Sequence, residues 1–214
     1  YDVTSIVDTW VQYAVVGDSS SSTFYINGAQ VGSPIAYGAG GNTHWYWGGL
    51  GGQPFGYVAN MFYYNRKLTL SEITQTYNYL APRLIEPTPT PTNTQTPTTT
   101  ATQTPTPTST PAVPVTTNLR LYFDPSNPSS YPGSGSVIND LSGNGLNGTM
   151  SNITFTSPYF SYNGSSSEIS IPDNGLLEPE SGDWSIEFWV NYSVIAGSSR
   201  ILIAKTDGGL ASQW

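Results

Sequence analysis

Cysteine is absent from this 214-residue chain, and charged side chains are scarce. Without cysteine no disulfide can form, so the fold must depend on its packed core. Charged residues make up 9% of the chain, against about a quarter in typical globular proteins. Ser, Thr, Asn and Gly therefore supply most of the polar surface, and this composition suits exposed β-structure with many turns.

Basic residues are also few. Six Lys and Arg face 14 Asp and Glu, which gives a formal net charge of −8 at pH 7. No basic stripe is present, so we expect no nucleic-acid partner. No run of about 18 apolar residues occurs, and we expect no membrane insertion. No signal peptide is visible at Tyr1, and we expect the chain to be an excerpt of a longer polypeptide.

Catalytic motifs are missing as well. Retaining glycanases place two carboxylates about 5 to 5.5 Å apart. Glu178 and Glu180 alternate, but they flank Pro179 in an expected loop. The one histidine, His44, has no partner His or Cys nearby, which favours a structural or surface role. We therefore predict that the protein is not an enzyme.

Three zones divide the chain. Residues 1–85 are aromatic and turn-rich, residues 86–116 are almost entirely Thr and Pro, and residues 117–214 return to an aromatic pattern. The middle zone has too few large apolar side chains to build a core. We predict an extended stalk, which at about 3.1 Å per residue spans on the order of 90 Å. Its composition is also that of O-glycosylated stalks.

Short strands are predicted on both sides of this stalk. In the first zone Asn27-Gly28 predicts a hairpin, because both turn positions require positive φ. The strands expected there are Trp10–Val16, Thr23–Ile26, Ala29–Val31, His44–Trp47 and Gly56–Tyr64. In the last zone, residues 119–124, 168–171 and 184–189 alternate apolar with polar side chains, as half-buried strands do. Ile201–Ala204 is predicted to be a buried run.

One short helix is expected after the strand that ends at Tyr64. Thr69 and Glu72 form a capping-box pattern at its start. Ile73, Tyr77 and Leu80 then share one face, and Pro82 is expected to end the helix. Many short strands, Gly-rich turns and one helix predict an all-β fold, an antiparallel sandwich or jelly roll.

Several tracts resemble the laminin G-like (concanavalin A-like lectin/glucanase) family. Trp10–Val15, Phe24–Gly28, Gly56–Tyr64 and Asn65–Ile73 are similar to the C-terminal half of that family. Leu121–Gly133, Asp140–Thr149, Tyr162–Pro172 and Trp184–Val190 are similar to its N-terminal half. The resemblance implies a jelly-roll sandwich with one short helix.

The order of the two halves is reversed relative to the family. Either residues 1–85 end one module and residues 117–214 begin the next in a tandem array, or the two halves dock as one permuted sandwich. We favour the tandem arrangement, because Thr/Pro stalks normally separate modules. Each half needs a complement in both cases, since a half sandwich exposes its apolar face.

A calcium site is one candidate. Some relatives of this fold bind calcium, which prefers oxygen ligands. The candidate ligands are Asp124, Asp140, Asn144 and Asn147. The alternative is that these residues only form turns. Ala59, where relatives often carry Asp, also weakens the calcium hypothesis.

A sugar site is the second candidate, because exposed aromatic rings stack on sugars and amides bind hydroxyls. The candidate residues are Tyr37, Asn42, Trp45, Trp47 and Gln53. The alternative is that the Trp45–Trp47 face belongs to the core. Four Asn-x-Ser/Thr sequons, at Asn147, Asn152, Asn163 and Asn191, matter only in a eukaryotic-type secretory pathway.

Together these features predict a non-catalytic adhesion or recognition module on a cell or virion surface, or otherwise extracellular. Its expected partners are surface glycans or glycoproteins and neighbouring copies or modules of the same protein. The alternative is a purely structural subunit or spacer of a filament, appendage or virion fibre.

Overall fold

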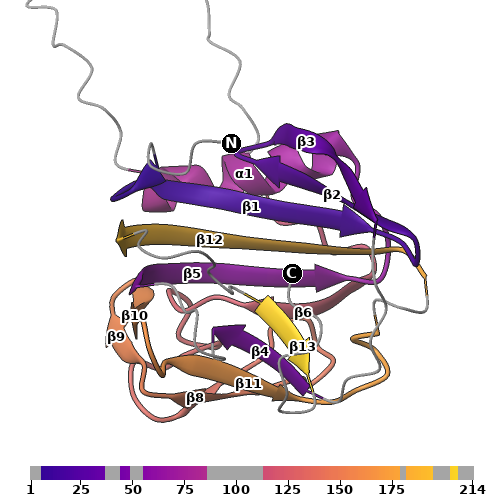
Figure 1. The fold of residues 1–214 in the computed structure, drawn as a ribbon. Coiled ribbons are helices and arrows are strands. Elements are labelled where there is room, and N and C mark those ends of the chain that lie inside the picture. Colours follow the sequence, from indigo (N-terminus) through magenta and orange to yellow (C-terminus); the bar gives the residue numbers. More distant parts are fainter. Residues whose placement is uncertain are drawn as a thin grey trace, which may run out of the picture.

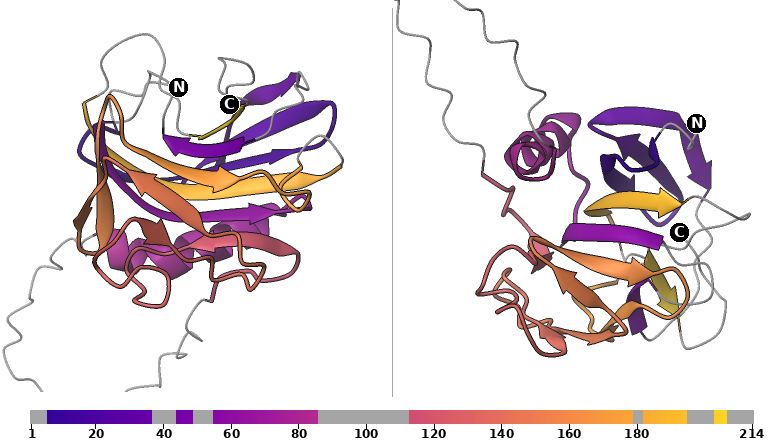
Figure 2. Two further views of the ribbon diagram at one scale, coloured as in Figure 1. Left: turned by 90° about the horizontal axis from the view of Figure 1, so that it is seen from below. Right: turned by 90° about the vertical axis from the view of Figure 1, so that its left-hand side faces the viewer.

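The computed structural model describes residues 6–36, 44–48, 55–85, 113–178, 182–194 and 203–206. For residues 44–48, 55, 194 and 203–206 only the backbone is described. These residues form two stacked antiparallel sheets and one helix (Figures 1 and 2). The predicted all-β class with one short helix is confirmed. No described helix is long and apolar enough to cross a membrane.

The larger sheet has eight strands. Seven of them lie in the order β3 (Ala29–Ala36), β2 (Ser21–Ile26), β1 (Trp10–Gly17), β12 (Trp184–Val194), β5 (Phe55–Tyr64), β10 (Tyr159–Asn163) and β9 (Thr154–Thr156). The eighth, β6 (Leu119–Phe123), pairs with the second half of β5. The predicted hairpin at Asn27-Gly28 joins β2 to β3, and both residues have positive φ.

The smaller sheet has five strands. Their order is β13 (Ile203–Thr206), β4 (His44–Gly48), β11 (Glu168–Pro172), β8 (Gly148–Ser151) and β7 (Val137–Ile138). A core fills the space between the two sheets. Its members include Val58, Phe123, Phe160, Ile169 and Ile171, each with no exposed surface.

Both sheets contain strands from before and after the Thr/Pro zone. In Figure 1 the late strand β12 lies between the early strands β1 and β5. In the smaller sheet the early strand β4 lies between the late strands β11 and β13. Strands of residues 6–85 and strands of residues 113–206 thus pair directly with each other in both sheets.

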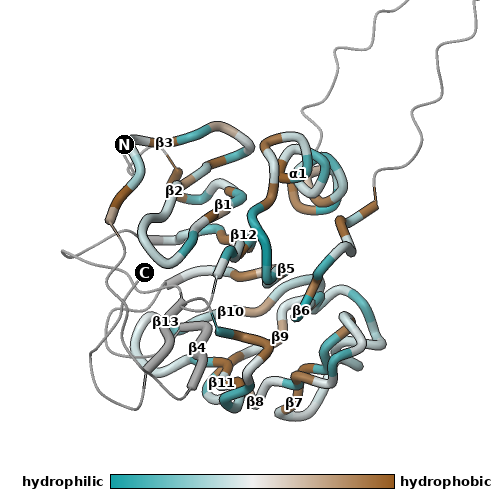
Figure 3. The backbone as a smooth tube through the Cα atoms, turned by 90° about the vertical axis from the view of Figure 1, so that its right-hand side faces the viewer, coloured by the Kyte–Doolittle hydropathy of each residue, from teal (hydrophilic) through white to brown (hydrophobic). Residues whose placement is uncertain are grey.

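The helix α1 (Leu70–Leu84) covers the outer face of the larger sheet. Thr69 and Glu72 form the predicted capping box. Ile73 and Leu80 are fully buried and Tyr77 is partly buried, as the pattern predicts. Figure 3 shows both hydrophobic and hydrophilic stretches along this helix.

Pro82 does not end the helix, so that prediction is wrong. The helix continues to Leu84, and the Ile85 N–H donates to the Ala81 carbonyl at 2.8 Å. A proline removes its own N–H from the helical ladder and crowds the carbonyl four residues before it, but N–H groups that follow it can still donate. The later bond from Ile85 therefore closes a last turn beyond Pro82.

The prediction that residues 119–124 and 184–189 form strands with one exposed face is also wrong. In β12 the face that was expected to meet solvent carries Ser185, Glu187 and Trp189, and each of these is at most 1% exposed. In β6 both Leu121 and Tyr122 are buried. A second core under α1 causes this, because it buries the face that the alternation assigns to solvent.

Residues 86–112, the bulk of the predicted stalk, lie outside the described residues. The last residues of the Thr/Pro zone belong to the sandwich. Val115 is 7% exposed, and its carbonyl accepts a hydrogen bond from the Tyr64 hydroxyl at 3.1 Å. The Val113 carbonyl accepts one from Gln75 Nε2 at 2.8 Å.

Candidate binding groove

The predicted sugar-binding tryptophans lie on β4. The backbone register pairs Trp45 with Ile171 and Trp47 with Ile169. Directly opposite residues share a face of a sheet, and both isoleucines lie in the core between the sheets. Positions 45 and 47 are therefore on the core-facing side of β4. The other three candidates, Tyr37, Asn42 and Gln53, lie outside the described residues.

The first candidate calcium ligand, Asp124, is paired with an arginine. Its side chain is 3% exposed, and its Oδ2 accepts from Arg83 Nη2 at 3.0 Å. The Tyr122 hydroxyl donates to the same oxygen at 3.0 Å, and the Ser126 hydroxyl donates to Oδ1 at 2.6 Å. Both oxygens of the Asp124 carboxylate therefore already accept hydrogen bonds from side chains of the protein.

The other three candidates form a turn. Asp140 accepts from the backbone N–H groups of Tyr122, Ser142 and Leu146 and from the Ser142 hydroxyl. Asn147 Oδ1 accepts from the Asp140 N–H, and Asn144 Nδ2 donates to the Leu119 and Arg120 carbonyls. These bonds fit the turn-forming alternative. Within the described ranges, no three His, Cys, Asp or Glu residues are grouped as a metal site.

The four sequon asparagines differ in their environments. Asn147, Asn152 and Asn163 are exposed. Asn163 Oδ1 accepts from the N–H groups of Ser165, Ser166 and Ser167. Asn191 lies inside β12, paired with β1 on one side and β5 on the other.

A row of aromatic rings on the outer face of the larger sheet was not predicted. The register places Trp10, Asn191 and Tyr57 opposite one another on three neighbouring strands. Tyr159 on β10 completes the group, with its ring centroid 5.1 Å from that of Trp10 and 4.8 Å from that of Tyr57. All three rings are half-buried.

A groove of about 500 Å³ is lined by two of these rings, those of Trp10 and Tyr159. Strands β1 and β10, the residues that lead into β1 and the C-terminus of α1 form its walls. The lining residues are Asp8, Thr9, Trp10, Arg83, Leu84, Ile85, Pro158 and Tyr159. Pockets of roughly 300 to 1,000 Å³ with aromatic walls and a few polar groups are typical small-ligand sites.

Two charged groups lie in this groove. Asp8 has a φ of 54°, a conformation in which few residues other than Gly, Asn and Asp are found. Asp8 is exposed, so its carboxylate is accessible from solvent. Arg83 is held by Asp124, and its guanidinium lies 5.5 Å from the centroid of the Tyr79 ring. Partial burial opposes its charge, but Asp124 raises the pKa of Arg83, so this cation is permanent.

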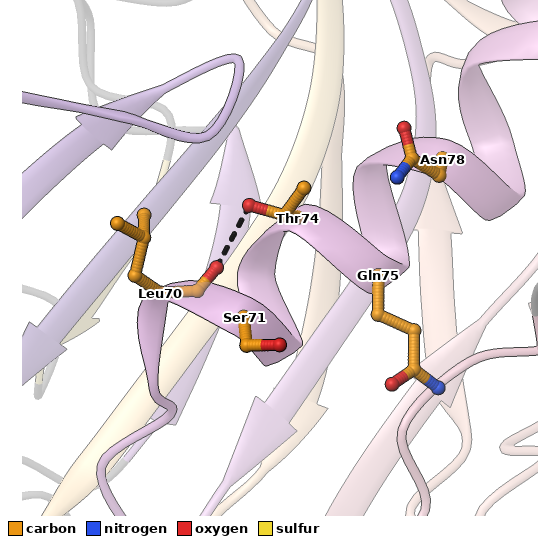
Figure 4. Close-up of a pocket in the computed structure, with 5 residues that line it drawn as sticks. All are labelled: Leu70, Ser71, Thr74, Gln75 and Asn78. Atoms are coloured by element: carbon orange, nitrogen blue, oxygen red, sulfur yellow. Dashed lines mark hydrogen bonds between the residues drawn. The ribbon is translucent and has the colours of Figure 1, made fainter.

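A second surface pocket lies on α1 alone (Figure 4). Its lining residues are Leu70, Ser71, Thr74, Gln75 and Asn78. The Thr74 hydroxyl donates to the Leu70 carbonyl at 2.8 Å, so it serves the helix itself. One exposed helix face gives a ligand contacts from one side only. The groove beside Trp10 is therefore the stronger candidate.

Sequence signals for this groove are weak. Trp10 begins a predicted strand and Tyr57 lies in another, but Tyr159 lies about a hundred residues further along the chain. Only the register β1–β12–β5–β10 brings them together. Comparison of the chain with protein-family models, curated proteins and solved structures found no match.

Proposed function

We propose that the protein is a non-catalytic recognition module that binds glycans in the groove beside Trp10, Tyr57 and Tyr159. The observation that carries the proposal is a cluster of three half-buried rings, of which Trp10 and Tyr159 line this groove and Tyr57 packs against Tyr159. Partly exposed aromatic rings offer flat apolar surfaces to the C–H faces of sugar rings. We further propose a laminin G-like jelly roll and an extracellular, cell-surface or virion-surface location.

The polar groups of the groove suit sugar hydroxyls. The Asp8 carboxylate is an acceptor, Arg83 is a donor, and Thr9 is exposed beside them. Neutral sugars need no strong field of one sign, and the groove has one carboxylate and one guanidinium among its lining residues. An aromatic wall with a few polar groups is the arrangement that orients a small ligand.

The residues that line the groove also support a non-catalytic role. Of the described residues that line the groove, only Asp8 carries a carboxyl group. Glycoside hydrolysis generally uses two carboxyl groups on either side of the bond. We also propose that binding is independent of calcium, because Asp124 and Asp140 are occupied by protein donors.

A structural role is the second candidate. It is favoured by the register of β4, which places positions 45 and 47 opposite core residues rather than on an open face. In that case the sandwich is a rigid subunit of a larger fibre or appendage, and the rings of the groove contact a neighbouring subunit.

A glycan array with the folded chain, with calcium and then with chelator, tests the first proposal. We expect binding in both conditions, about tenfold weaker or lost in Tyr159→Ala and kept in Tyr159→Phe, which retains the ring. Tyr25→Ala is the matched control, because Tyr25 packs on the same outer core but does not line the groove. A folded chain that binds no glycan would exclude the recognition role and leave the structural one.

A further inference from the structure

The two chain segments on either side of the Thr/Pro tract cannot complete their sheets alone. Among the described strands, β4 and β5 of the first segment (residues 6–85) pair only with strands of the second segment (residues 113–206). Both described neighbours of β12, which belongs to the second segment, come from the first segment. Each segment therefore needs the other for its central strands, whose backbone groups would otherwise be unpaired.

The apolar contacts divide in the same way. The core between the sheets is built from both segments, with Val58 and Met61 from the first and Phe160, Ile169 and Ile186 from the second. Tyr13 stacks on Phe188 with centroids 5.5 Å apart, and Tyr77 stacks on Trp189 at 5.4 Å. The surface between the segments is thus the protein core itself, not a peripheral contact.

Only the Thr/Pro tract, residues 86–112, joins these complementary segments. Its composition provides no core residue that would fix which copy a segment pairs with. A tether acts only through effective concentration, which is in the millimolar range for short flexible linkers and falls as the linker lengthens. Nothing in the paired surfaces distinguishes a segment of the same chain from one of another copy.

We propose that copies of this chain exchange halves, so that residues 6–85 of one copy pair with residues 113–206 of another. The partner is a second copy, and the interface is the β1–β12–β5–β10 pairing together with both cores. Such exchange links sandwiches through their Thr/Pro tracts into dimers or longer chains. It also builds the groove from two copies, because Trp10 and Arg83 belong to the first segment and Tyr159 to the second.

Complementation between two full-length variants tests the exchange. Val58→Asp disrupts the first segment and Ile169→Asp the second, since each places a charge at a core position with no exposure. Each variant alone is expected to lose the near-UV circular dichroism of the packed core. Unfolded together and refolded at ~0.1–1 mM, the mixture should regain up to half of the wild-type signal. One of the two sandwiches in an exchanged pair is then fully native.

A spectrum of the mixture equal to the sum of the two separate spectra would overturn the proposal. Energy transfer between labelled copies gives a second readout that does not require the variants to unfold. The chain lacks cysteine, so Ser19→Cys and Gly182→Cys in separate copies accept single dyes. Both positions are exposed, and a Cβ added at Gly182 meets nothing within 4 Å.

These two positions lie close together in one sandwich but belong to different segments. Their neighbours Asp18 and Asp183 both contact the Lys67 ammonium. Dyes on separate copies therefore approach each other only when the copies exchange halves. Co-refolded copies should show strong transfer, with a dimer mass; its absence in a monomeric sample also overturns the exchange.

Discussion

Glu187 is the most unusual single residue of the fold. It is 1% exposed beneath α1, and its Oε1 accepts from Gln12 Nε2 at 3.1 Å. Its other oxygen has no donor in good hydrogen-bond geometry among the described residues, and the nearby Thr76 hydroxyl only partly offsets the effect of burial on the pKa. Burial raises the pKa of Glu187 to about 8, because the charged form loses its hydration. The folded protein therefore keeps this carboxyl protonated at pH values where the unfolded chain has released the proton.

This residue makes stability pH-dependent. Between pH of about 4.5 and about 8 the folded state binds one more proton than the unfolded state, so the free energy of unfolding should fall as pH rises. The loss is on the order of 1.4 kcal/mol per pH unit in that window. Glu187→Gln keeps an acceptor for Gln12 and should remove the slope. Urea midpoints at pH 5 and pH 8.5 measure both effects.

Two other carboxyl groups have pKa values that are shifted in the opposite direction. The hydrogen bond from Arg66 holds the pKa of Glu72 down at about 2, and Lys67 lowers the pKa of Asp18. Both groups titrate below pH 4.5, where they contribute stability that is lost on acidification. A wild-type midpoint that is the same at pH 5 and pH 8.5 would contradict the assignment to Glu187.

At the scale of elements, α1 determines whether the outer face of the larger sheet is buried or exposed. The helix start could be predicted, because the capping box is a local signal in four residues. The helix also buries Trp189 and Glu187 on a strand more than a hundred residues away. That contact is long-range, so the alternation of β12 indicated a solvent-facing side that the fold does not have. The same limit hid the aromatic row, which depends on register between distant strands.

The capping box should measurably stabilise α1. Thr69 Oγ1 accepts from the Glu72 N–H at 3.3 Å, and Glu72 Oε2 accepts from the Thr69 N–H at 2.9 Å. Thr69→Ala should lower the free energy of unfolding by about 1 kcal/mol. Thr74→Ala is the control, because that exposed hydroxyl only returns a bond to its own helix (Figure 4). Equal stability of the two variants in urea titrations would refute the capping role.

At the scale of the whole molecule, composition predicted three zones but could not predict their pairing. The Thr/Pro zone is evident in the sequence, and so is the need of each half for a complement. Which half supplies the complement depends on registers such as Trp10 with Asn191 and Tyr57 with Asn191. Those registers are properties of the assembled sheet, so composition alone could not separate the docked from the tandem arrangement.

Cutting the Thr/Pro tract separates these two arrangements experimentally. A specific protease sequence inserted within residues 86–112 leaves every described contact intact. If the halves are docked, the two pieces should stay together after cleavage, with an unchanged near-UV spectrum. Folding of the cut protein then becomes bimolecular, so each tenfold dilution should cost about 1.4 kcal/mol of apparent stability.

The uncut chain is the control for this measurement. At micromolar concentration, far below the millimolar range in which exchange between copies competes with the tether, its halves pair within one chain, so its melting temperature should not change with dilution. The cut protein should melt lower at each dilution step, because only mass action then holds residues 6–85 against residues 113–206. Pieces that separate on cleavage, with loss of the near-UV signal, would mean that neither half completes the other and that each is complemented outside this chain.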